Sequence, residues 1–186
     1  MTAFIRRVIG VAVLDAATFE EVEADRSTTA QAMAVVLLSA AAAGVGAHGF
    51  GSPWSQLPVF ATVALLAWAA WALLTYEIGI GLLPEPATQS DVTELLRTIG
   101  FSAAPGMLRV IGIVPAFTTP VFVLTTVWML AAMVVGVRHA LDYASVGRAL
   151  AVCGIGWLLT LVLLVLAGLF FTPALSFVLV ALPDIR

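Results

Sequence analysis

The sequence has few charged residues and no lysine. Charged side chains make up 10% of the 186 residues and hydrophobic side chains 62%, whereas a soluble domain has roughly 25% and 45–50%. A soluble fold of this length could not bury so much apolar surface, so the composition excludes an ordinary soluble domain. The net charge of −3 also leaves no basic footprint for nucleic acid.

Patterns of reactive residues are missing as well. The single cysteine, Cys153, excludes an internal disulfide, and its apolar neighbours predict a packing role. No paired Cys/His spacing, G-x-S-x-G motif or phosphate-binding glycine loop is present. We therefore expect no enzymatic activity, no cofactor and no metal. His48 and His139 are expected at opposite membrane faces, where each is more typical of a polar end group than of a ligand.

Five long apolar segments dominate the sequence. They cover residues 29–47, 57–83, 95–117, 120–137 and 146–171. About 20 apolar residues are needed for a helix to cross a bilayer, and these runs are too uniform for the strands of a barrel. The pattern predicts an all-α integral membrane bundle of five transmembrane helices. We expect a cytoplasmic N-terminal segment at 1–28, before a transmembrane domain at 29–186. An apolar stretch at 174–182 is too short to span again.

Arginine placement predicts the orientation, because positively charged loops stay in the cytoplasm. Arginines precede the first span and lie between the second and third spans and between the fourth and fifth. The alternation places the N-terminus inside and the C-terminus outside. The richness in arginine, alanine, valine, leucine and glycine is typical of a GC-rich bacterial genome, so we expect the bacterial cytoplasmic membrane.

The first residues predict an amphipathic helix. Its apolar face is Phe4, Ile5, Val8, Ile9 and Ala12, and Arg6 and Arg7 lie opposite. Such a helix is typical of the inner membrane surface. An ordinary connecting helix packed on the bundle is an equally good interpretation.

Three charges in the second and third predicted spans are candidates for a pair or a site. Glu77 lies near the inner end of the second span, and Arg97 and Arg109 lie in the third. If the third helix is straight, Arg97 lies at the depth of Glu77, so we expect these two residues to pair. A break at Pro105-Gly106 would favour Arg109 instead. A structural ion pair is the preferred interpretation, and a ligand or ion path of a small transporter or channel is the alternative.

Backbone-breaking and small residues point to close helix contacts. Pro105, Gly106 and Pro115 interrupt the third span, and broken helices line binding sites in transporters or form simple kinks. Small residues four apart, such as Ala40 and Gly44, let helices approach closely. Internal packing explains this spacing better than self-association does.

Two segments and one aromatic residue carry a family resemblance. They are TFEEVEAD at 18–25 before the first span, GFSAAPGMLRVIGIVP at 100–115, and Trp128 in the fourth span. From about Leu14 onward the chain resembles the bacterial branch of the Yip family, the Ypt/Rab-GTPase-interacting membrane proteins. The resemblance implies a five-helix membrane domain without enzymatic activity. Eukaryotic members are trafficking adaptors that bind prenylated GTPases and one another.

For this chain, the resemblance implies a membrane adaptor or an accessory subunit of a larger membrane assembly. The expected partners are the lipid bilayer and other membrane proteins or copies of the chain itself. A small-molecule substrate is not specified.

Overall fold

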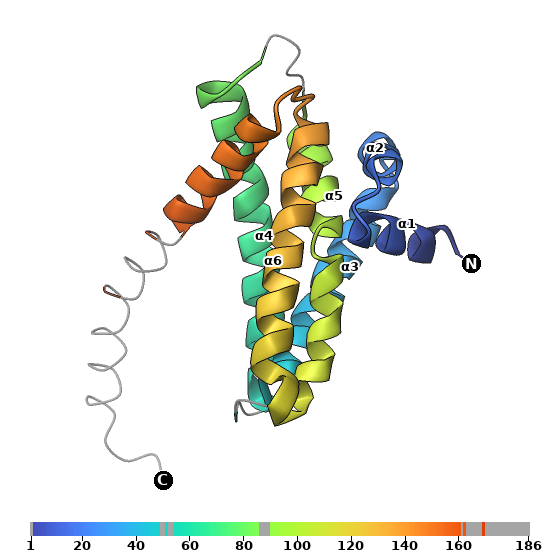
Figure 1. Ribbon diagram of the computed structural model, residues 1–186, viewed down its shortest axis with the longest axis vertical. Coiled ribbons are helices and arrows are strands. Elements are labelled where there is room, and N and C mark those ends of the chain that lie inside the picture. The colour runs from blue at the N-terminus through green and yellow to red at the C-terminus, as the bar shows by residue number, and fades with distance from the viewer. Residues whose placement is uncertain are drawn as a thin grey trace.

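The computed structural model describes residues 2–48, 51, 54–85, 90–160, 162 and 169. Every element in these ranges is a helix, which confirms the predicted all-α class. The bundle consists of α3 (Thr28–Ala47), α4 (Leu57–Tyr76), α5 (Val92–Phe101) and α6 (Pro115–Ala140). Two short helices, α1 (Ala3–Ala12) and α2 (Ala16–Ala24), lie on one flank of the bundle, and α1 runs across its long axis (Figure 1).

Three shorter elements and one further helix complete the described part. A 3-10 turn, η2 (Trp54–Gln56), precedes α4, and a π-helical turn, η3 (Glu77–Leu82), extends it. A 3-10 helix, η4 (Ala104–Ile113), follows α5. The final helix, Val146–Thr160, turns back from the end of α6 and diverges from the bundle axis in Figure 1.

Among the described residues, three helices are long and apolar enough to cross a membrane. They are Thr28–Ala47, Leu65–Leu82 and Pro115–Ala140, which fall within or overlap the first, second and fourth predicted spans. The third predicted span is not one helix, because α5 ends at Phe101 and η4 begins at Ala104. The described part of the fifth is the shorter apolar helix Val146–Thr160. The apolar stretch at 174–182 lies outside the described residues.

The break in the third segment follows from its residues. Pro105 lacks a backbone N–H and cannot sit in the interior of an α-helix without disturbing it. Glycines let this segment lie directly on α3: a methyl group at Gly106 would overlap the Ser39 side chain, and one at Gly100 would lie 2.8 Å from Ala32 Cβ. Gly100 and Gly106 therefore let the third segment pack closely on α3. The packing role of the Ala40 and Gly44 spacing stays a prediction.

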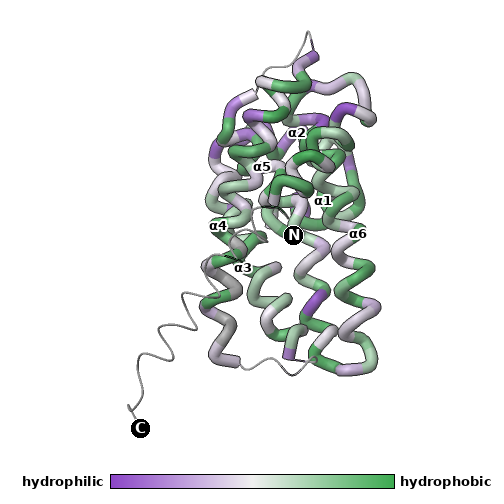
Figure 2. The backbone as a smooth tube through the Cα atoms, turned by 90° about the vertical axis from the view of Figure 1, so that its left-hand side faces the viewer, coloured by the Kyte–Doolittle hydropathy of each residue, from purple (hydrophilic) through white to green (hydrophobic). Residues whose placement is uncertain are grey.

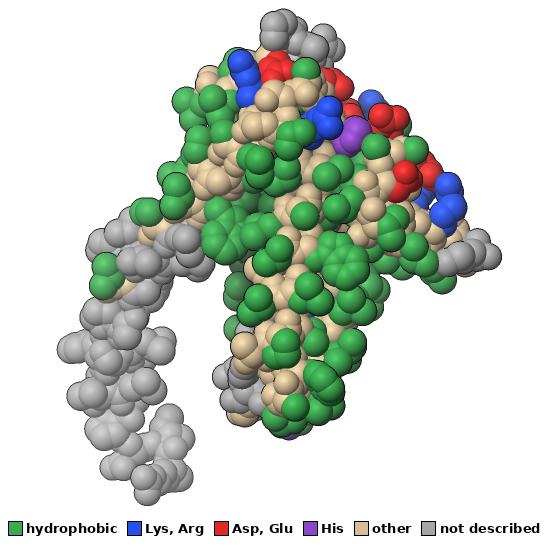
Figure 3. All heavy atoms as spheres, in the orientation of Figure 1, with side chains coloured by type: hydrophobic (Ala, Val, Ile, Leu, Met, Phe, Trp, Pro, Cys, Tyr) green, Lys and Arg blue, Asp and Glu red, His purple; other side chains and the backbone are tan. Residues whose placement is uncertain are grey.

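Polar and apolar residues separate along the bundle. Most hydrophilic segments gather at one end in Figure 2, and charged side chains crowd the same end in Figure 3, while hydrophobic side chains cover the visible flank. We call this the charged end. One buried cluster here joins α4, α5, α6 and the final helix through residues such as Trp71, Leu95, Leu141 and Val152. Cys153 belongs to this cluster, so its predicted packing position is confirmed.

Candidate binding cavity

At the charged end, Arg7 joins α1 to α2 and α3. Its guanidinium lies 2.9 Å from Glu21 Oε1 and 2.7 Å from Asp25 Oδ2, and it donates to Gln31 Oε1 at 3.2 Å. Arg7, predicted to lie opposite the apolar face of this helix, is therefore buried between α1, α2 and α3. The acidic helix α2 folds back along α1 and draws the arginine inward. Arg6 stays exposed, although it also contacts Glu21.

The predicted apolar face of α1 divides into two. Phe4 and Val8 pack against the bundle, whereas Ile5 and Ile9 are exposed. Trp128 Nε1 also donates to the Ala12 carbonyl at 2.6 Å and ties α6 to the end of α1. The helix packed on the bundle is thus confirmed. Contact of Ile5 and Ile9 with a membrane surface stays a prediction.

Arg97 is buried, with 3% of its surface exposed. Its Nε donates to the backbone carbonyl oxygen of Glu23 at 2.9 Å, and its Nη2 donates to the same oxygen. The last carbonyls of a helix have no partner within the helix, so a cation is well placed there. Arg97 therefore caps the C-terminal end of α2.

The predicted Glu77–Arg97 pair is wrong. Glu77 lies exposed on the outer face of η3, while Ile78 and Gly79 turn toward the core. Within the ranges that the structure describes, Glu77 forms no ion pair. The reason is that α2 covers the start of α5 and supplies a nearer acceptor for Arg97.

Tyr143 was not singled out by its sequence context, yet it supports the π-helical turn. Its hydroxyl lies 3.0 Å from the Gly79 carbonyl oxygen and 2.9 Å from that of Leu83. A π-helical turn shifts the regular hydrogen-bond pattern, so its carbonyls need partners from elsewhere. No local signal in the sequence could have paired residues so far apart along the chain.

Glu23 is the most perturbed acid at the charged end. Burial raises the pKa of its carboxyl to about 7, and the nearby carboxylates Glu94 and Asp142 raise it further, while Arg97 opposes the shift. The group lies outside the long apolar helices. Its carboxyl is therefore close to half protonated near neutral pH.

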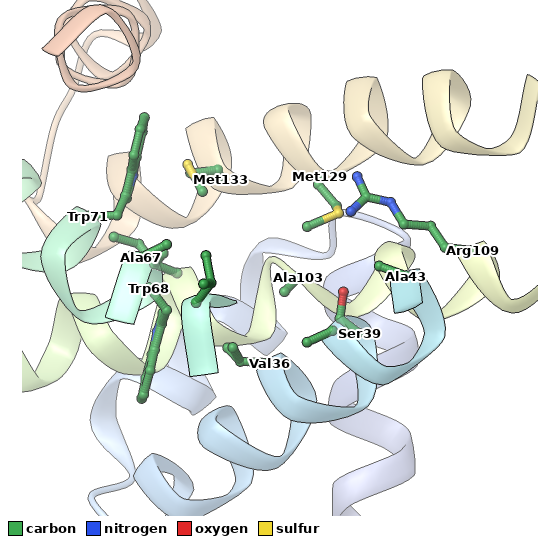
Figure 4. Close-up of a pocket in the computed structure, with 13 residues that line it drawn as sticks. Val36, Ser39, Ala43, Ala67, Trp68, Trp71, Ala103, Arg109, Met129 and Met133 are labelled. Carbon is green, nitrogen blue, oxygen red and sulfur yellow. The ribbon is translucent and has the colours of Figure 1, made fainter. Parts of the chain in front are cut away.

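A cavity of about 350 Å³ lies deeper in the bundle. Its walls come from α3, α4, α6 and the third segment, as Figure 4 shows. Nearly all of its lining is apolar; the larger side chains are Val36, Val63, Trp68, Trp71, Ile99, Met129 and Met133. Ser39 and Arg109 are its polar exceptions, apart from the indole nitrogens.

Arg109 closes one end of this cavity, and its guanidinium points toward Met129 (Figure 4). Its Nε donates to Thr125 Oγ1 at 3.1 Å and its Nη2 to Thr126 Oγ1 at 2.9 Å. Its Cζ lies 5.2 Å from the Phe122 ring centroid. No carboxylate among the described residues forms an ion pair with it.

The two threonines are oriented to receive the arginine. Each hydroxyl donates at 2.7 Å to the carbonyl four residues earlier in α6, which leaves oxygen lone pairs for the guanidinium. The chain does break near Pro105, as the alternative pairing required, but Arg109 turns to α6 and not to Glu77, so that pairing is wrong too. Thr125-Thr126, a polar doublet in an apolar span, was the signal available in the sequence.

The two histidines lie at opposite ends of the bundle, as predicted. His48 follows α3 and stacks on Trp54, with ring centroids 4.4 Å apart. His139 lies in the last turn of α6 at the charged end, 3.8 Å from Glu20. They cannot share a ligand.

Comparison with known proteins adds nothing to this geometry: no protein-family model, curated protein or solved structure matches the chain. The resemblance to the Yip family therefore rests on the sequence features alone.

Proposed function

We propose that the chain is a non-enzymatic integral membrane protein of the Yip type, acting as a membrane adaptor or an accessory subunit of a larger membrane assembly. The final helix, Val146–Thr160, carries this proposal. Val152 packs in the bundle, whereas the consecutive residues Trp157, Leu158 and Leu159 are all exposed. Consecutive residues of an α-helix are about 100° apart, so these three cover more than half of its circumference. This half of the helix is available to a neighbouring membrane protein.

The proposal includes five spans in the bacterial cytoplasmic membrane, with the N-terminus inside. The third segment is long enough despite its break. At 1.5 Å per residue α5 extends about 15 Å, and at 2.0 Å per residue η4 extends about 20 Å, which together exceed the ~30 Å hydrocarbon core. A fifth span requires the final helix to continue beyond Thr160, outside its described range.

The hydrogen bonds of two buried polar side chains, Arg97 and Ser102, support a structural role for both. Arg97 binds a backbone carbonyl of α2, and the Ser102 hydroxyl lies within hydrogen-bonding distance of the carbonyls of Thr98 and Ala132. Both side chains hold helices together. Such fixed contacts suit a scaffold whose outer surface does the binding.

Site-specific photo-cross-linking in the membrane tests this function. A photoreactive amino acid at Leu158, which is 65% exposed, should yield adducts with a membrane protein or a second copy. The same group at buried Val152 is the matched control and should yield only intramolecular products. Adducts to lipid alone at Leu158 would contradict the adaptor or subunit role.

One observation favours the alternative, a small transporter or channel subunit: Arg109 lies at the end of a cavity. Glu77 and Arg97 lie elsewhere, so the three charges do not line one path. The test is labelling of Ser39→Cys in a Cys153→Ala background with a membrane-impermeant thiol reagent. A transporter predicts labelling from both sides of the membrane, and the adaptor proposal predicts labelling from neither.

A further inference from the structure

Arg109 is a cation whose hydrogen-bond partners are both neutral. Thr125 and Thr126 are neutral acceptors, and they occupy two of the five N–H donors of the guanidinium. The other donors have no recorded partner in the part of the chain that the structure describes. Thr125 lies about 15 Å along α6 from its start at 1.5 Å per residue, so the cation lies inside the hydrocarbon region if α6 spans the bilayer. A cation at that depth is expensive without an anion.

The cavity beside this cation is apolar and elongated. Its lining follows α4 from Val63 to Trp71, about 12 Å at 1.5 Å per residue. Trp68 and Trp71 line the end remote from Arg109 (Figure 4). Its volume of about 350 Å³ falls at the small end of the 300–1,000 Å³ typical of ligand sites. Val63 on its rim is 55% exposed, which leaves a lateral way in from the bilayer.

We propose that this cavity binds a single-chain carboxylate amphiphile, with its carboxylate on Arg109 and its alkyl chain along the apolar walls toward Trp68 and Trp71. A planar carboxylate matches the guanidinium fork with two parallel hydrogen bonds. The depth of Arg109 disfavours a phospholipid, whose headgroup and second chain would have to be submerged with it. This inference does not depend on the adaptor role.

Tryptophan fluorescence quenching in phosphatidylcholine nanodiscs tests the site. The probe is ω-bromoundecanoate, whose bromine quenches indole rings that it touches. Wild-type protein should show saturable quenching, and ω-bromoundecanol, with the same chain and no charge, should show only the linear quenching of bilayer partitioning. Charge-assisted hydrogen bonds contribute about 1.5–3 kcal/mol, so Arg109→Gln should weaken the apparent affinity at least about tenfold.

Three further variants keep the test decisive. Arg109→Lys retains the charge but not the fork, and should bind with intermediate affinity. Ala67→Phe fills the cavity from its rim without touching Arg109, and should abolish saturable quenching even if Arg109→Gln fails to fold. Arg148→Gln is the matched control: this arginine bonds the Pro84 carbonyl and Glu85 far from the cavity, so binding should be unchanged.

Four outcomes would overturn the proposal. The first is that ω-bromoundecanol binds as saturably as ω-bromoundecanoate, and the second is that both Arg109→Gln and Ala67→Phe bind the probe as wild type does. The third is that acetate, which has the charge without the chain, displaces the probe as well as unbrominated undecanoate would, and the fourth is that wild type shows no saturable quenching. Displacement of the probe by phosphatidylglycerol in the nanodisc would assign the site to a phospholipid and overturn the single-chain assignment.

Discussion

The Arg97 side chain donates hydrogen bonds from two of its nitrogens to one backbone oxygen, that of Glu23, 74 residues earlier in the sequence. This contact holds the C-terminal end of α2 against α5. It thereby places the acidic helix α2 over the charged end of the bundle. Arg97, predicted from the sequence to pair with Glu77, therefore caps a helix instead.

Replacing Arg97 tests that capping role. Arg97→Gln should destabilise the protein by about 1–3 kcal/mol, because the Glu23 carbonyl loses a charged donor in a buried setting. Glu77→Gln is the control and should change stability by less than about 0.5 kcal/mol, as is usual for an exposed site. Thermal unfolding followed by circular dichroism in mild detergent measures both. If the double variant is destabilised by more or less than the sum of the two single variants, Glu77 and Arg97 do interact, and the predicted pair is right after all.

Replacing the two adjacent arginines of α1 should lower stability by different amounts. Arg7→Ala removes a buried guanidinium shared by Glu21 and Asp25, so we expect a loss of about 1–2 kcal/mol; the two carboxylates are partly exposed and can be rehydrated. Arg6→Ala should cost less than about 0.5 kcal/mol, since its side chain is 61% exposed. Amide hydrogen exchange should also quicken across α1 in Arg7→Ala only. Equal exchange in the two variants would show that Arg7 does not anchor α1.

Glu23 makes stability depend on pH. Its folded pKa of about 7 lies above the ordinary glutamate pKa of 4.5. The folded protein therefore binds an extra proton between these two pH values and loses stability as pH rises through that window. Glu23→Gln removes the ionised form but keeps the carbonyl that Arg97 binds. The variant should match wild type near about pH 4 and exceed it by on the order of 1 kcal/mol near about pH 8, after allowance for screening.

Melting temperatures of the two proteins across this range measure the effect. The difference should grow between about pH 4.5 and about pH 7 and then level off. A difference that is the same at every pH would mean that the Glu23 carboxyl is not perturbed by folding.

Membrane orientation can be tested with two engineered cysteines in a Cys153→Ala background. Ser55 lies in η2 and Ser145 precedes the final helix, and both are exposed, at opposite ends of the bundle. The arginine distribution predicts that an impermeant maleimide added to intact cells labels Ser55→Cys but not Ser145→Cys, which should react only after permeabilisation. The reverse pattern would place the charged end outside.

The sequence alone determined the helical class and the approximate positions of the apolar helices, and it offered a break near Pro105 as the alternative to a straight third helix. These properties are local. Apolar run length reflects the thickness of a bilayer, and a proline weakens a helix locally, although Pro120 lies inside α6 without ending it. It also placed His48 and His139 at opposite ends, because an odd number of predicted spans separates them.

The tertiary structure decided what each charge contacts. The sequence predicts how deep a residue lies along a span, but it does not predict how one helix is rotated against another. This rotation directs Glu77 outward and Arg109 toward Thr125. The fold of α2 over the bundle likewise depends on packing of Phe19 and Val22, which no local pattern could orient. The cavity exists only between helices, because its walls come from segments far apart in the chain and its one strong charge is aimed by a threonine pair on a neighbouring helix.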